Sequence, residues 1–221
     1  FNTTEVEDMS GMFYYCYYLE KLDLSNFKTP KLKKMEYMFY KCSFLRRLEA
    51  NNIETNNVVN MTHLFAECIY LNVLNIRIYN TSNVLDMSAM YLDCGSLTSI
   101  SISNYDTSKV QNMSRMFETC NAVNHLDVNN FKTSEVKDMS NMFRLCQILT
   151  SLKLSSFDTK NTENMSSMFE ECLSLKQLNI LNFDTSKVKD MSNMFKGCSN
   201  LNELKINLDT SQVQDMSRMF Y

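Results

Sequence analysis

The strongest constraint in this sequence is the spacing of its cysteines. All eight fall at intervals of 26 residues. They are Cys16, Cys42, Cys68, Cys94, Cys120, Cys146, Cys172 and Cys198. A fixed period of this length indicates a repeat architecture, in which each unit buries its apolar side chains only against its neighbours. The 221 residues therefore predict one continuous array rather than separate globular domains.

The methionines and aromatic residues follow the same period. All 17 methionines occupy two positions of the repeat, and an aromatic residue follows the second position. These positions begin at Met9 and Met12, with Phe13 as the first aromatic residue. One step, from Met191 to Met216, is shorter by one residue. Residues of these types at a fixed place in every repeat are predicted to form a shared dry core.

The first half of each repeat has the spacing of a short helix. From Met9 to Cys16, the apolar residues stand at i, i+3, i+4 and i+7, which is one face of an α-helix. Asp8 precedes this face, and most repeats carry Asp or Asn at the same place. Such a residue can cap the first N–H groups of a helix, with Ser10 and its counterparts as rival caps. Two helical turns would be marginal alone, so packing must hold them.

The second half has the pattern of a short strand. Leu19, Leu22 and Leu24 form a Leu-x-x-Leu-x-Leu string that ends in strand-like alternation. A threonine column beginning at Thr3 can satisfy backbone groups in a buried turn. An apolar column closes the repeat and is broken at Thr162.

These patterns predict an α/β solenoid. We expect a leucine-rich-repeat-like, right-handed coil of 26-residue repeats, each with a short strand and a short helix. The array spans residues 1–221 and contains about eight and a half repeats. Because both ends of the sequence fall inside a repeat, we expect the array to belong to a longer protein or to have very short caps.

Composition excludes several classes of function. The 22 basic and 25 acidic residues give a formal charge of −3, which argues against a nucleic-acid partner. There is no apolar run of about 18 residues and no basic-then-apolar leader, so the sequence predicts no transmembrane segment and no targeting segment.

The sulfur-containing side chains are predicted to pack in the core, and not to form disulfides or bind a metal ion. Eight cysteines suit a disulfide framework, but these share the core face with methionine and phenylalanine, which favours buried free thiols. Met12 and Cys16 together suit Cu(I) in principle. The same spacing packs a core, so we predict no metal and no cofactor.

Catalytic signals are equally weak. The two histidines, His63 and His125, are 62 residues apart, which is not a multiple of 26, so they occupy different places on the coil. Neither has a nucleophile suggested beside it, and a general base needs a partner within reach. No glycine-rich phosphate loop is present. The sequence therefore predicts no catalytic residues and no enzyme.

A candidate partner-binding surface lies in the first three repeats. Tyrosines outside the core columns gather there, and residues 28–47 hold seven basic residues against one acid. Tyrosine and arginine are favoured at binding hot spots. The candidate residues are Tyr14, Tyr15, Tyr17, Tyr18, Tyr40, Lys33, Lys34, Lys41, Arg46 and Arg47. The alternative is that this end packs on a preceding repeat or cap.

The repeat resembles a known family. The string DTSKVKDMSNMFKGC, residues 184–198, is similar to the 26-residue repeat of Mycoplasma-type and Listeria-type surface lipoproteins, which is related to BspA-like leucine-rich repeats. The resemblance covers the whole chain. It implies a cell-surface or secreted array with adhesion or recognition roles, and it carries over no catalytic residue.

Three hypotheses of function follow. The leading one is a non-enzymatic, extracellular binding or adhesion module whose partner is a protein or a glycan on another cell or surface. The second is a structural spacer or assembly subunit that packs on neighbouring repeats or subunits. The third is an intracellular interaction scaffold, which abundant reduced cysteine mildly favours.

Overall fold

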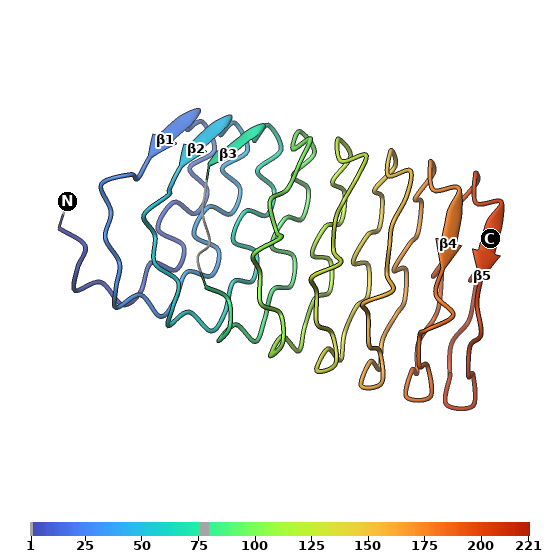
Figure 1. Cartoon of the computed structure of the whole chain (residues 1–221). Helices are drawn as coiled ribbons and strands as arrows, with labels where there is room; N and C mark the ends of the chain where they lie inside the picture. The colour runs from blue at the N-terminus through green and yellow to red at the C-terminus, as the bar shows by residue number, and fades with distance from the viewer. Residues whose placement is uncertain (1, 76–79) are drawn as a thin grey trace.

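The chain forms a stack of similar coils. The computed structural model describes residues 2–75 and 80–221. The coils follow one another along a single axis, with the N-terminus at one end of the stack and the C-terminus at the other (Figure 1). The core runs inside the stack through its whole length.

Short parallel strands line one edge of the stack. One sheet contains β1 (Lys21–Asp23), β2 (Arg47–Glu49) and β3 (Val73–Asn75), and a second contains β4 (Gln177–Asn179) and β5 (Glu203–Lys205). Leu22 pairs with Leu48, and Leu178 pairs with Leu204, so each pairing joins residues 26 apart. Between the two sheets, an isolated bridge joins His125 to Ser151. The predicted strand and the 26-residue coil are therefore confirmed.

The predicted helix is wrong. Within the described residues no α-helix forms, and the segment from Met9 to Cys16 is a series of tight turns. The N–H groups that bond within the segment reach three residues back and not four, as from Met12 to the Met9 carbonyl and from Cys16 to the Phe13 carbonyl. Two residues of each complete turn segment have positive φ, Gly11 at 61° and Tyr15 at 60° in the first coil. Positive φ at the third residue suits a β-turn and is incompatible with an α-helix.

No helix forms because alternate N–H groups of the turn segment donate to carbonyl groups of the next coil. In the third coil, the N–H groups of His63, Phe65 and Glu67 donate to carbonyls 25 residues ahead. Parallel β-type pairing of this kind holds chains about 4.8 Å apart, whereas packed helices need about 8–10 Å. Turns can therefore stack at the same spacing as the strands, and helices cannot.

The residues predicted as helix caps perform a related task. The Asp8 carboxylate accepts the N–H of Ser10 at 2.9 Å, and the Asp190 carboxylate accepts the N–H of Ser192 at 2.8 Å. A side chain that accepts the N–H two residues ahead makes an Asx-turn. The Asp or Asn position therefore does cap a backbone N–H group, as predicted, but the element that it begins is a turn and not a helix.

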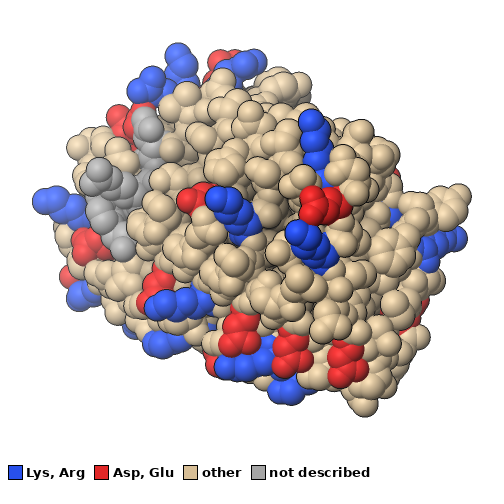
Figure 2. Space-filling model, turned by 45° about the vertical axis from the view of Figure 1, so that its right-hand side comes forward, with Lys and Arg blue, Asp and Glu red and all other residues tan. Residues whose placement is uncertain are grey.

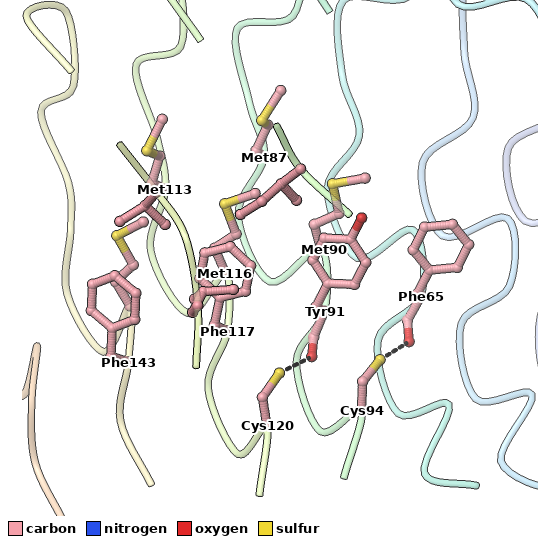
Figure 3. Packing of buried hydrophobic residues seen from close by; sticks show 14 of the residues in the cluster. Phe65, Met87, Met90, Tyr91, Cys94, Met113, Met116, Phe117, Cys120 and Phe143 are labelled. Carbon is pink, nitrogen blue, oxygen red and sulfur yellow. Dashed lines mark hydrogen bonds between the residues drawn. The ribbon is translucent and has the colours of Figure 1, made fainter. Parts of the chain in front are cut away.

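The aromatic column forms an unbroken stack of rings. Neighbouring ring centroids lie 5.5–5.9 Å apart and their planes are within 20° of parallel. The rings belong to Phe13, Phe39, Phe65, Tyr91, Phe117, Phe143, Phe169, Phe195 and Phe220. The methionine columns lie against this stack, as Met87, Met90, Met113 and Met116 show in Figure 3. The predicted dry core is confirmed.

The threonine column binds the coils together, as predicted. The Thr107 hydroxyl donates to the Lys132 carbonyl at 3.0 Å and accepts the Lys132 N–H at 2.8 Å. Thr81 and Thr133 repeat the same donation with Asp106 and Asp158. Each buried hydroxyl thus satisfies two backbone groups of the next coil, which would otherwise be left without partners.

Replacing Thr107 tests this role. Thr107→Val keeps the shape but removes the hydroxyl, so we expect a loss of about 2 kcal/mol in the free energy of unfolding. Thr107→Ser keeps the hydroxyl and loses one methyl group, so we expect about 1 kcal/mol. Urea unfolding followed by circular dichroism measures both. A serine variant less stable than the valine variant would contradict the assigned role.

Candidate interaction surface

One outer surface of the stack carries the candidate residues. It is formed by the turn segments. Residues 11, 14, 15, 17 and 18 of the first coil, and the residues that stand at the same positions of later coils, are not part of the hydrophobic core. We call this surface the turn face. Side chains at the same position of successive coils lie beside one another on it, because the backbones pair 25 or 26 residues apart.

Five rings form a first network on the turn face. Tyr14 stacks on Tyr40 with centroids 5.2 Å apart, and Tyr15 meets Tyr40 edge-on at 5.8 Å. Tyr37 contacts Tyr14 and Tyr40 edge-on and stacks on His63 at 4.8 Å. Burial lowers the pKa of His63, and its Nδ1 lies 2.9 Å from the Thr62 hydroxyl.

Four more rings form a second network. Phe44 lies between Tyr18, at 5.7 Å, and Tyr70, at 5.2 Å, and it meets Tyr17 edge-on at 5.2 Å. The Arg46 guanidinium lies over the Tyr70 ring, 5.6 Å from its centroid, in a cation–π contact. We call the two networks together the aromatic patch. Its members are Tyr14, Tyr15, Tyr17, Tyr18, Tyr37, Tyr40, Phe44, His63 and Tyr70.

The structure brings together the five tyrosines that the sequence singled out. The candidate residues named from the sequence lack four members of the patch, which are Tyr37, Phe44, His63 and Tyr70. The signal was present, since Tyr18, Phe44 and Tyr70 are spaced by 26 residues, as are Tyr37 and His63. In a stacked array, aromatic residues one period apart are neighbours in space.

The cations of the candidate site do not form a free basic cluster. Lys33 pairs with Glu7 at 2.8 Å and Lys34 with Asp8 at 3.6 Å.

Arg47 pairs with Glu49 at 2.7 Å, and Lys41 pairs with Glu67 at 3.4 Å. Lys41 also lies over the Tyr15 ring, and its contact with Tyr15 raises the pKa of its ammonium group. On the face shown in Figure 2, cations and carboxylates are interspersed. Four of the five candidate cations are thus paired with carboxylates, and Arg46 lies over the Tyr70 ring.

Farther along the stack, the turn face carries an ionic ladder. Arg144 donates to Glu118 at 2.7 Å on one side and to Glu170 at 3.0 Å on the other. Glu118 also pairs with Arg115, and Glu170 also pairs with Lys196. Burial raises the pKa of Glu170, but hydrogen bonds led by the one from Lys196 outweigh it and lower the pKa overall.

Removing Arg144 tests this ladder. Arg144→Met leaves two buried carboxylates with one partner fewer each, so we expect a loss of about 2 kcal/mol in unfolding free energy. The matched control is Lys189→Met, whose pair with Glu163 is exposed, and we expect less than about 0.5 kcal/mol there. Equal losses in the two variants, measured by urea unfolding, would show that the ladder adds nothing.

All eight cysteines are free thiols, of which six are buried in the stack, and Cys16 and Cys198, in the outer coils, are half-buried. The Cys94 thiol donates to the Phe65 carbonyl at 3.2 Å, and the Cys120 thiol to the Tyr91 carbonyl at 3.3 Å (Figure 3). Burial raises the pKa of these thiols, in the case of Cys146 to about 12. The thiolate is the form that binds metals and attacks electrophiles, so these groups are held in their unreactive form. No cluster able to hold a metal ion occurs in residues 2–75 and 80–221.

Thiol labelling tests this arrangement. At pH 8 and without reductant, we expect the six fully buried cysteines of the native protein to react at least a hundredfold more slowly than in urea, because their thiolates are suppressed and covered. In urea all eight should react. Mass spectrometry after iodoacetamide treatment counts the labelled cysteines in the native and in the unfolded protein. Fewer than eight labelled cysteines in urea would reveal disulfides.

The histidines do not meet. His63 lies in the aromatic patch on the turn face, and His125 lies in the bridge at the strand edge.

No helix in the described part of the chain has the length and apolarity to cross a membrane.

Repeated coils, a stacked dry core and an outward aromatic surface define a solenoid repeat protein. The model of the family "Mycoplasma protein of unknown function, DUF285" matches residues 1–73, 45–147 and 121–221, and the chain belongs to this family. The match confirms the resemblance to a Mycoplasma-type 26-residue repeat. A search of the curated proteins finds no match.

Solved structures of leucine-rich repeat proteins are similar at low identity. A leucine-rich repeat protein of T. pallidum is 19% identical with a TM-score of 0.40, over 81% of this chain and 66% of that one. One from Bacteroides ovatus is 16% identical with a TM-score of 0.44, over 94% and 69%. A leucine rich cell surface protein from Faecalibacterium prausnitzii is 16% identical with a TM-score of 0.36, over 92% and 77%. The chain thus spans about two thirds to three quarters of their lengths.

Proposed function

We propose that this chain is a non-enzymatic interaction module of a cell surface or secreted protein, and that the aromatic patch is its contact surface for a protein or glycan ligand. The observation that carries the proposal is the patch itself. Soluble proteins rarely leave large contiguous apolar surfaces exposed unless something binds there. The resemblance of the repeat to surface-lipoprotein repeats supports an extracellular location.

Tyrosine is well suited to this task. Its ring supplies a large, rigid contact area and its hydroxyl supplies a hydrogen bond, at little loss of conformational entropy. The rings of the patch also hold one another through edge-to-face contacts, such as Tyr37 with Tyr40 at 5.7 Å. A surface whose side chains are ordered before binding loses less entropy when a ligand arrives.

Paired variants at one coil position test the proposal. Tyr70 is 43% exposed, and Ile148, which occupies the same position three coils later, is 42% exposed. We expect Tyr70→Ser, combined with Tyr17→Ser, to weaken binding about tenfold or more on arrays of glycans and matrix proteins. Ile148→Ser should leave binding unchanged, and none of these changes should shift the melting temperature appreciably.

Two outcomes would count against the proposal. Equal binding by the tyrosine and isoleucine variants would remove the patch as the contact surface. If the chain captured nothing on either array and did not associate with itself, the spacer function would be the better account.

A further inference from the structure

We propose that the aromatic patch pairs with the same patch on a second copy of this chain, forming a symmetric dimer. This inference rests on the proposed function, because it names the ligand of that surface. A two-fold interface requires a surface that is complementary to itself. Exposure, area and charge each bear on this requirement.

The exposure of the patch is lateral. Tyr37 is 38% exposed and Tyr70 is 43% exposed, although each lies in a coil that is stacked on both sides. Their rings therefore point away from the axis of the stack. Tyr18, in the first coil, extends the same surface and is 81% exposed. A partner can reach the patch from the side without continuing the array.

The area of the patch is sufficient for a dimer. Tyr14, Tyr15, Tyr17, Tyr18, Tyr37 and Tyr70 are each exposed over a large part of their surface. A tyrosine has roughly 200 Å² to bury. Tyr37 and Tyr70, which are covered by coils on both sides, are 38% and 43% exposed, so six tyrosines at outward positions present about 500 Å² sideways on one copy. Two copies would together bury about 1,000 Å², the size that a specific interface must reach. Partly exposed Phe44, Tyr40 and His63 add to this area.

The charges of the patch do not oppose self-pairing. Lys41 on the turn face is paired with Glu67, and Arg47, in β2 at the strand edge, is paired with Glu49. Arg46 keeps its charge over the Tyr70 ring. A surface with a high net charge would repel its own image, whereas a single cation held over a ring on each copy adds little repulsion.

The tyrosine hydroxyls make the patch self-complementary. A phenolic hydroxyl both donates and accepts a hydrogen bond, so identical groups facing each other across a two-fold axis can pair. Aromatic rings also favour edge-to-face contact with other rings. The same geometry already occurs within the patch, between Tyr17 and Tyr18 with planes 82° apart. The patch thus offers to a second copy the contacts that it makes within itself.

Sedimentation velocity over a range of concentrations tests the dimer. We expect the wild-type chain to move from one chain mass to two between about 1 μM and 1 mM. The variant carrying Tyr14→Ser, Tyr18→Ser, Tyr37→Ser and Tyr70→Ser should dimerise at least thirtyfold more weakly. The control carries Val59→Ser, Leu85→Ser, Ile148→Ser and Leu181→Ser, four exposed apolar residues outside the patch, and it should match the wild type. Circular dichroism melting checks that both variants remain folded.

The outcomes separate this inference from the function on which it rests. A wild-type chain that stays monomeric to about 1 mM, or a dimer that both quadruple variants form equally, overturns the inference. A monomer that still binds a glycan or matrix protein through its tyrosines overturns the dimer and leaves the proposed function standing. A monomer that binds nothing through these residues overturns both.

Discussion

The hydrogen bonds between successive coils are the interaction on which the structure depends. They run along both the strand edge and the turn segments, and they hold residues 25 or 26 apart against one another. Once the backbones are paired in this way, each position of the repeat becomes a column. Phenylalanine stacks on phenylalanine, and threonine reaches the backbone beside the next threonine. The pairing of the backbones therefore explains why the same residue type recurs at the same position of each repeat, since these side chains contact one another.

Departures from the repeat show how tightly the pairing constrains the core. Thr162 stands in an otherwise apolar column, and its buried hydroxyl donates to the Val136 carbonyl of the preceding coil at 3.1 Å. Tyr91 replaces a phenylalanine in the ring stack, and its hydroxyl lies 2.6 Å from that of Tyr105 across the same coil. Both of these hydroxyl groups in the core thus have a hydrogen-bond partner, as burial requires. The shortened repeat keeps its phase as well, because Phe220 still stacks on Phe195.

Most of the fold could be predicted from the sequence, and the part that could not has a definite cause. The period, the core columns and the strand at Leu22 all follow from residue types and spacing. The turn segment was predicted as a helix because the i, i+3, i+4, i+7 spacing of its apolar residues also fits successive turns that bond three residues back. What decides between them is where the alternate N–H groups go, and this depends on the neighbouring coil. The aromatic patch was foreseen through its tyrosines, whereas the pairing of Lys33 and Lys34 with acids one coil earlier was not.

The direction of the turn hydrogen bonds gives the array an electrical polarity. In the third coil, residues 61, 63, 65 and 67 all donate to the coil that follows, and other coils repeat this orientation. Aligned peptide dipoles add, so the turn face carries a cumulative dipole parallel to the long axis of the stack. Its positive side is oriented toward the C-terminal coils, opposite to the sense found in an α-helix. Each additional repeat lengthens this dipole, which makes the solenoid directional even where its side chains are nearly identical from coil to coil.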